Sequence, residues 1–153
     1  MNALDPRVRV VWAGRAVALA AVLGAALVLA DRYALAVPAW AVVAVVALAA
    51  TLGLAHTALR YRRWRYEVQE DALYLERGVV TEVETAVPFV RIQHVDTQRG
   101  PLERLAGVTS VVVYTAGSRG ADVTVPGLDP ERARTLQRRL RQLAVVSEAG
   151  DAV

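Results

Sequence analysis

Two long apolar runs occupy much of the N-terminal part of the chain, over residues 16–30 and 34–55, and only residues 31–33 separate them. The hydrocarbon core of a bilayer requires about 20 apolar residues in a helix, and the second run meets that length. The first run meets it when it extends a few residues toward the N-terminus, which places Arg15 inside the helix with its side chain reaching to the headgroups. The pattern predicts a transmembrane hairpin within residues 1–63, with helices over about residues 10–30 and 34–58.

The positions of the arginines predict the orientation of this hairpin. Several precede the first helix, and a basic cluster follows the second, made of Arg60, Arg62, Arg63 and Arg65. Cytoplasmic flanks of membrane helices carry an excess of Lys and Arg, so we expect a multi-pass protein of the plasma membrane with both termini in the cytoplasm. A secretory signal peptide cleaved near Ala30 is the alternative. The second helix would then enter from outside, and the rest of the chain would still be cytoplasmic.

After Trp64 the apolar residues change from helical spacing to alternation, which is typical of half-buried strands. Val95 has the opposite parity to Ile92, so that strand either contains a bulge near Gln93-His94 or is buried on both faces. The run around Val112 is apolar at consecutive positions, which indicates a central strand covered on both sides. The pattern predicts six strands, over residues 66–69, 73–76, 79–87, 90–97, 108–116 and 121–125.

Two helices are expected in the same region. Residues 102–106 followed by Gly107 predict one short helical turn with a glycine stop. Asp129-Pro130 is a helix start, with Asp as the N-cap and Pro at the first helical position. The helix that follows should cover one open end or face of the sheet, because it carries an apolar stripe of Ala133, Leu136, Leu140 and Leu143. Residues 147–153 show no pattern, and we expect a disordered tail.

An antiparallel meander of six strands closed by one C-terminal helix is the outline of a pleckstrin-homology-like (PH-like) barrel or sandwich, here over residues 64–146. The fold class expected is therefore an α+β membrane protein. Some segments also resemble the bacterial PH-like family of small membrane-flanked proteins, namely Val87-Pro88-Phe89 with Arg91-Ile92-Gln93, Leu102-Glu103-Arg104-Leu105 with Gly107, Thr115-Ala116-Gly117, and Gly127-Leu128. Phe89 stands where this family would have Tyr. The resemblance implies a two-helix N-terminal anchor followed by this domain, and membrane attachment rather than a particular activity.

The distribution of charge narrows the class of partner. Residues 1–65 hold eight Arg and two acidic residues, whereas residues 66–153 hold ten Arg and thirteen acidic residues. The basic balance of the chain therefore belongs to the membrane segment. An acidic domain lacks the phosphate-neutralising surface on which nucleic-acid binding depends, so we expect no nucleic-acid partner. The chain has no cysteine, which excludes disulfides and thiolate metal sites.

No catalytic arrangement is recognisable, and we expect a non-enzymatic protein without a metal or cofactor. His94 and Asp96 share one strand face at positions i and i+2, where they form either a base with its orienting carboxylate or a plain surface pair. The serines lie outside any Gly-x-Ser-x-Gly context. His56 is expected at the inner membrane interface.

Eukaryotic PH domains bind phosphoinositides with basic residues in the first strand-turn-strand unit. The corresponding turn of this chain is Glu70-Asp71, whose charges repel a phosphorylated headgroup. The basic cluster is instead expected to attract anionic headgroups weakly and non-specifically, at about 1 kcal/mol for each Arg near the surface. The same arginines are equally well explained as determinants of topology alone.

Four polar residues gather in and around the family-like motifs: Arg91, Gln93, Arg99 and Arg104. They form either a groove for a peptide or lipid headgroup, or internal pairs with acids such as Asp96 or Glu103 that fix the turns. Both interpretations remain open at this point.

The leading hypothesis is a binding or scaffold module held at the inner face of the cell membrane, where it engages a membrane protein. The family resemblance suggests a larger membrane protein with similar domains as one candidate partner. The alternative is an accessory subunit of a transport or envelope-stress system that acts through its transmembrane hairpin. Ala20 and Gly24 have the small-xxx-small spacing that permits such helix packing.

Overall fold

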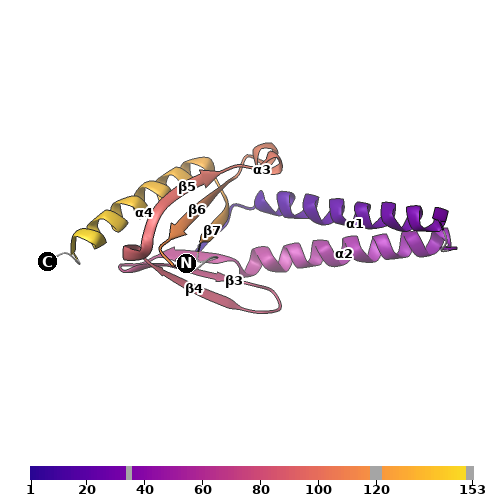
Figure 1. Ribbon diagram of the computed structural model, residues 1–153, viewed down its shortest axis with the longest axis horizontal. Coiled ribbons are helices and arrows are strands. Elements are labelled where there is room, and N and C mark those ends of the chain that lie inside the picture. The colour runs from indigo at the N-terminus through magenta and orange to yellow at the C-terminus, as the bar shows by residue number, and fades with distance from the viewer. Residues whose placement is uncertain (34–35, 118–121, 151–153) are drawn as a thin grey trace.

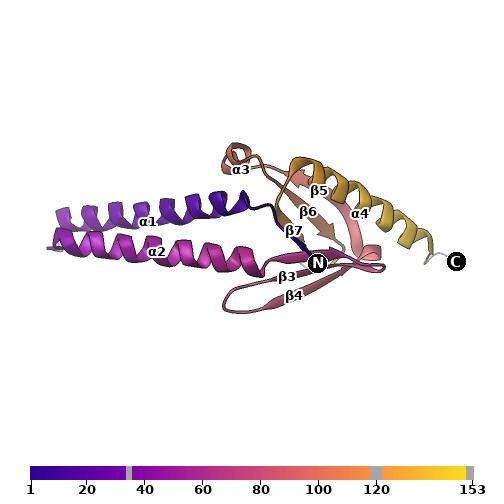
Figure 2. The ribbon, with the colours of Figure 1, turned by 180° about the vertical axis from the view of Figure 1, so that it is seen from behind.

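The computed structural model describes residues 1–33, 36–117 and 122–150. The molecule is elongated, with two long helices that project side by side from one end of a β domain and a third long helix along the other side of that domain (Figures 1 and 2). The projecting pair is α1 (Val8–Tyr33) and α2 (Ala39–Arg63), and the third helix is α4 (Pro130–Gly150).

The projecting helices have the properties of membrane spans. Both are long and apolar enough to cross a bilayer, and large apolar side chains such as Leu19, Val22 and Trp40 are exposed on their surfaces. In water such exposure would be costly, whereas lipid tails are a favourable environment for these side chains.

Small residues allow α1 and α2 to approach each other closely. A Cβ added at Gly24 would lie 2.8 Å from Val46 Cγ2, and one added at Gly53 would lie 2.9 Å from Ala16 Cβ. Ala20 and Gly24 are both buried. The small-xxx-small spacing of Ala20 and Gly24 is therefore used for contact between the two helices of this chain.

The β domain contains two antiparallel sheets, which are not closed into a barrel. The first sheet has the strand order β1 (Asn2–Ala3), β2 (Arg65–Val68), β3 (Ala72–Arg77), β4 (Val83–Pro88). The second has the order β5 (Ile92–Gln98), β6 (Thr109–Thr115), β7 (Val123–Leu128). The expected α+β, PH-like architecture is confirmed. Each of the six expected strands has its counterpart, and β1 is an additional strand from the N-terminus.

Local details of the strands follow the alternation of apolar residues. The β2–β3 hairpin pairs Tyr66 with Leu75 and Val68 with Leu73, as expected from their shared face. The register of β5 shifts between Ile92 and His94, and most of its residues are not buried, so of the two alternatives the structure favours the bulge over burial on both faces. β6 is the central strand of its sheet, also as expected.

The strand boundaries differ from those predicted around the connection between the first sheet and the second. A short 3₁₀ helix, η1 (Phe89–Arg91), follows β4 and turns the chain into β5, so the expected strand over residues 90–97 begins only at Ile92. β4 itself starts at Val83 rather than near Val79. Apolar and polar residues also alternate over residues 79–82, but these residues lie in the turn before β4 and do not pair with another strand.

Helix boundaries also differ from those expected. α1 begins at Val8 and α2 continues to Arg63, and residues at these ends, such as Val8 and Trp64, are buried in the core of the β domain. α4 continues through Gly150, so residues 147–150 are helical where a disordered tail was expected. The expected helix start at residue 34, the strand start at residue 121 and residues 151–153 of the tail lie outside the described residues.

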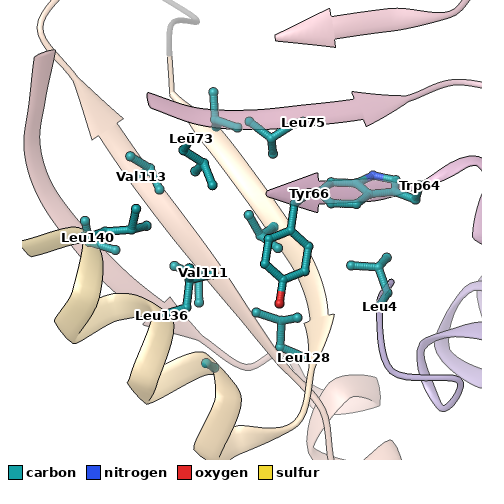
Figure 3. Packing of buried hydrophobic residues seen from close by; sticks show 14 of the residues in the cluster. Leu4, Trp64, Tyr66, Leu73, Leu75, Val111, Val113, Leu128, Leu136 and Leu140 are labelled. Carbon is teal, nitrogen blue, oxygen red and sulfur yellow. The ribbon is translucent and has the colours of Figure 1, made fainter. Parts of the chain in front are cut away.

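The core lies between the two sheets, and α4 packs against β5, η1 and β6 with its apolar side chains in the same core (Figure 3). Apolar side chains from the first sheet meet those from the second and from α4, namely Tyr66, Leu73, Leu75, Val111, Val113, Leu128, Leu136 and Leu140. The N-terminal part of the chain joins the same core through Leu4, Val8, Val11 and Trp12. The helical hairpin and the β domain are therefore joined through a common set of buried side chains.

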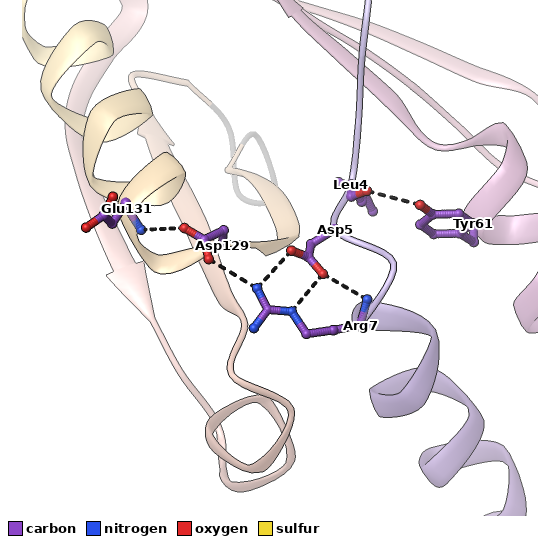
Figure 4. Close-up of polar contacts among 6 residues, drawn as sticks. All are labelled: Leu4, Asp5, Arg7, Tyr61, Asp129 and Glu131. Atoms are coloured by element: carbon purple, nitrogen blue, oxygen red, sulfur yellow. Dashed lines mark hydrogen bonds and ion pairs between the residues drawn. The ribbon is translucent and has the colours of Figure 1, made fainter.

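Polar contacts reinforce this junction (Figure 4). Arg7 donates to both carboxylate oxygens of Asp5, at 3.0 and 2.9 Å, and to Asp129 at 3.1 Å. The Asp5 backbone N–H donates to the carbonyl oxygen of Gly127 at 2.8 Å, and the Tyr61 hydroxyl donates to the Leu4 carbonyl at 3.2 Å. The hydrogen bonds from Arg7 lower the pKa of Asp5 below its ordinary value of 3.8. The entry into α1 is thus bonded to the start of α4.

Candidate functional site

The four polar motif residues occupy two separate places. Arg91 is in η1 and Gln93 lies at the bulge of β5, whereas Arg99 follows the other end of β5 and Arg104 is in α3 (Pro101–Ala106). β5 lies between Arg91 and Arg99, and at about 3.3 Å per residue this strand is about 20 Å long. The four residues therefore form one group at each end of β5 rather than the single groove that was one of the two interpretations.

The group around α3 is built on a tightly bonded turn. Pro101 occupies the first helical turn, and Gly107 ends the helix with a φ of 71°, a left-handed conformation that glycine adopts at little cost. The Glu103 carboxylate accepts hydrogen bonds from the Gly100 N–H at 2.6 Å and from the Ser110 hydroxyl at 2.7 Å. Arg99 donates to the carbonyl oxygen of Val108 at 3.2 Å. Within the motif, Glu103 therefore fixes the turn.

The remaining residues of this motif are on the surface. Leu105 is 86% exposed and Leu102 is 41% exposed, and Arg104 between them is exposed too. We call Leu102, Arg104 and Leu105 the α3 patch. α3 packs against α1 on the side of the domain from which the long helices project (Figures 1 and 2). An apolar and basic patch is thus held beside the base of the hairpin.

The internal pairs of Arg91 and Arg104, which were the other interpretation, are not formed among the described residues. Glu103 is occupied by Gly100 and Ser110, and Asp96 lies nearest to His94. Across residues 1–33, 36–117 and 122–150, no ion pair joins Arg91, Arg99 or Arg104 to a carboxylate. These arginines therefore keep their charge available at the surface.

The pair of His94 and Asp96 has the geometry of surface residues. The two side chains are 57% and 48% exposed, and His94 Nε2 is 3.8 Å from Asp96 Oδ2, beyond hydrogen-bond length. The His94 ring stacks on Tyr114 with 4.2 Å between the ring centroids. In the described part of the chain, no group of three His, Cys, Asp or Glu residues could hold a metal ion.

The basic cluster is divided among three roles. Arg65 donates to the Trp64 carbonyl at 2.8 Å and to the Tyr61 carbonyl at 3.4 Å, which satisfies carbonyl groups at the end of α2. The guanidinium of Arg60 lies over the Trp12 ring, 4.3 Å from its centroid. Arg62 and Arg63 are exposed in the last turn of α2, at the level where headgroups would lie.

Comparison with known sequences places this architecture in a family. The profile described as "Bacterial PH domain" matches residues 15–144, which include most of the hairpin and nearly all of the β domain. The chain belongs to the bacterial PH domain family. This membership confirms the resemblance seen in the Val-Pro-Phe and Leu-Glu-Arg-Leu segments.

A relative of this bacterial PH domain protein supports its location in the membrane. The UPF0699 transmembrane protein YdbS of Bacillus subtilis (strain 168) is 34% identical over 90 residues, which is 59% of this chain and 55% of that protein. The match therefore spans about half the length of the relative. No solved structure matches the chain. With its two long apolar helices, the protein is a transmembrane member of the family.

Sequence reasoning missed the part that the N-terminal segment plays in the domain. Leu4 is buried. Asp5-Pro6 lies just before α1, and the Asp5 carboxylate accepts the Arg7 N–H as the Asp129 carboxylate accepts the Glu131 N–H at the start of α4. This repeated Asp-Pro signal predicts a helix start several residues before residue 10. The same signal does not predict that Leu4 and Val8 are buried, which only the folded domain shows.

Proposed function

We propose that this protein is a non-enzymatic scaffold that presents its PH-like domain at the inner face of the plasma membrane and binds a second membrane protein there. The observation that carries the proposal is the α3 patch, in which two exposed leucines flank an unpaired Arg104 beside the base of α1. Exposed apolar residues next to charge are typical of interaction surfaces.

The attachment of the domain supports a partner in the same membrane. The core shared by Leu4, Val8 and Trp12 and the bonds from Arg7 hold the domain in one position relative to the hairpin. The α3 patch is therefore kept close to the bilayer surface. A membrane protein with an apolar and acidic surface at that level would meet it without reorientation, and a larger protein with similar domains is the candidate partner.

The second group of motif residues is a separate candidate surface. Arg91 and Gln93 are exposed at the far end of β5, away from the α3 patch. If the partner binds only near the membrane, substitution of Arg91 leaves binding unchanged while substitution of Arg104 weakens it.

If the protein were instead an accessory subunit that acts through its hairpin, it would have to contact other helices through a surface other than Ala20 and Gly24. Ala20 and Gly24, on which this alternative was based, are buried against α2. Contacts with other transmembrane helices would have to use the large exposed residues of α1, such as Val17 and Val22.

Site-specific photocrosslinking in cells tests the proposal. A photoreactive amino acid is placed at Leu105, with the exposed Arg138 on α4 as the matched control position. We expect a crosslink to a membrane protein from position 105 and none from position 138, and Arg104→Gln should reduce it more than Arg91→Gln. A crosslink from position 105 to lipid alone would show that the α3 patch contacts the bilayer and would contradict the proposal.

A further inference from the structure

A groove between α1 and α2 is basic at one end and apolar at the other, and it plays no part in the proposed binding of a membrane protein. Its volume is about 450 Å³, and it lies between the two helices near the β domain. One end is lined by Arg15, His56 and Arg60, and the other end by apolar residues that include Leu19 and Leu23.

Helix geometry makes the two arginines converge. Side chains in an α-helix lean toward its N-terminus. α1 leaves the β domain and α2 returns to it, so the side chain of Arg15 leans toward the domain and that of Arg60 leans away from it. Ala16 lies opposite Gly53, so Arg60 is nearer the domain than Arg15, and the two side chains extend toward one level.

The charged groups that act on Arg60 are positive. Arg15 and Arg77 are the charged neighbours that act on Arg60, and the Arg60 guanidinium is held over the Trp12 ring at 4.3 Å. Like charges gathered beside an apolar surface repel one another unless an anion is present.

No carboxylate of the hairpin neutralises this group. Residues 1–65 contain only Asp5 and Asp31 as acids. Asp5 is bonded to Arg7, and Asp31 lies at the opposite end of the helices, where it accepts the Val37 N–H. Among the ion pairs of the described residues, none includes Arg15 or Arg60.

We propose that this groove binds one anionic phospholipid, with the phosphate between Arg15 and Arg60 and one acyl chain along Leu19 and Leu23. The charge at one end matches a phosphate, and the apolar surface beyond it lies within the apolar length of both helices. A soluble anion would leave that surface without a partner, so a lipid is the occupant that fits both ends. His56 supplies a further polar group at the headgroup level. Ala16 and Gly53, where the two helices approach closely, also line the groove.

Lipid binding in this groove does not depend on the protein partner, and it differs from the weak attraction expected of the whole basic cluster. General attraction depends on the number of arginines near the surface. A groove site depends on which arginines are present.

Native mass spectrometry of the full chain, extracted from vesicles of phosphatidylglycerol and phosphatidylcholine, tests the difference. We expect one phosphatidylglycerol to remain bound to the parent protein. The double variant Arg15→Gln, Arg60→Gln should bind it at least about tenfold more weakly. The double variant Arg62→Gln, Arg63→Gln removes the same charge from exposed positions outside the groove and should retain the lipid.

An uncharged variant keeps the test independent of membrane insertion. Ala49→Leu places a larger side chain on the wall of the groove without changing any charge, and it should also weaken retention of phosphatidylglycerol. Thermal unfolding in detergent identifies any variant that does not fold, and such a variant is replaced by the corresponding single substitution. Equal retention of phosphatidylcholine, or equal losses in the two arginine double variants, would overturn the proposal.

Discussion

Val8, the first residue of α1, lies directly against Gly127 of β7, and a Cβ added at Gly127 would overlap the Val8 side chain. Gly127 also has a φ of 59°, in the left-handed region that glycine adopts without strain. The same glycine accepts the Asp5 backbone N–H through its carbonyl oxygen at 2.8 Å. This contact joins the membrane hairpin to the sheet of the β domain.

Gly127→Ala should therefore destabilise the whole protein. The left-handed backbone costs a non-glycine residue about 1–2 kcal/mol, and overlap in a packed core adds about 1–3 kcal/mol. We expect a clear fall in the thermal unfolding temperature of the full chain in detergent. Gly14→Ala is the matched control, because nothing lies within 4 Å of an added Cβ there and alanine favours the helix. An equal effect of both substitutions would show that the Val8 contact contributes nothing.

The β domain should not fold stably when it is separated from the N-terminal segment. A fragment that begins at Arg65 lacks Leu4, Val8, Trp12 and Trp64, all of which are buried in the common core. Loss of several large core side chains exceeds the margin of stability of a small domain. We expect circular dichroism to show no cooperative melt for this fragment. A cooperative melt would mean that the two sheets and α4 are sufficient.

The C-terminal helix should be required for the core. Leu140 is fully buried, so Leu140→Asp would place an unpaired charge in an apolar environment, at a cost of several kcal/mol. Val145 lies on the same helix and is 66% exposed, so Val145→Asp should have little effect on the unfolding temperature. If both variants melt alike, α4 does not pack on the second sheet.

The junction should make stability depend on pH in the acidic range. Hydrogen bonds from Arg7 lower the pKa of Asp5 below its ordinary value of 3.8. A carboxylate with a lowered pKa in the folded state stabilises the protein fully above its unfolded pKa, and this stabilisation is lost as the pH falls through the folded pKa. The unfolding temperature of the parent should therefore fall between neutral pH and a pH below 3.8.

Asp5→Asn should reduce that dependence, because the group that titrates is removed. Unfolding temperatures measured across the same pH range for both proteins provide the comparison. Arg7→Gln is a second control, since it removes the donor that lowers the Asp5 pKa. A pH dependence unchanged in both variants would show that this pair does not contribute to acid stability.

The distribution of arginine predicts that both ends of the chain are cytoplasmic. Arginines flank the hairpin on the side of the β domain, whereas the connection between the helices has only Arg32 with Asp31. We expect an alkaline phosphatase fused after the C-terminus to be inactive and a fluorescent protein in the same place to be bright. The reverse pattern would invert the orientation and remove the argument for a cytoplasmic partner.

Many elements of this protein are determined by short stretches of its sequence. Alternation at Tyr66, Val68, Leu73 and Leu75 sets the faces of the first hairpin, because the side-chain period of a strand is two. The reversed parity of Val95 left either a bulge or burial on both faces for the same reason. Asp129-Pro130 and Gly107 mark a helix start and a helix end, since each acts on backbone groups within one turn.

Other features depended on contacts between residues far apart in the chain. The sequence pattern does not show that Leu4 and Trp12 belong to the core of a domain that begins more than fifty residues later. It likewise suggested that Arg91 and Arg104 share a surface, because they are close in sequence, whereas β5 separates them.

The convergence of Arg15 and Arg60 is decided in the same way, by the pairing of two antiparallel helices through Gly24 and Gly53. Local spacing determines which face of an element is apolar, because it depends only on the helical or strand period. Which faces meet depends on the shape and volume of side chains across the whole core, and only the tertiary structure decides that.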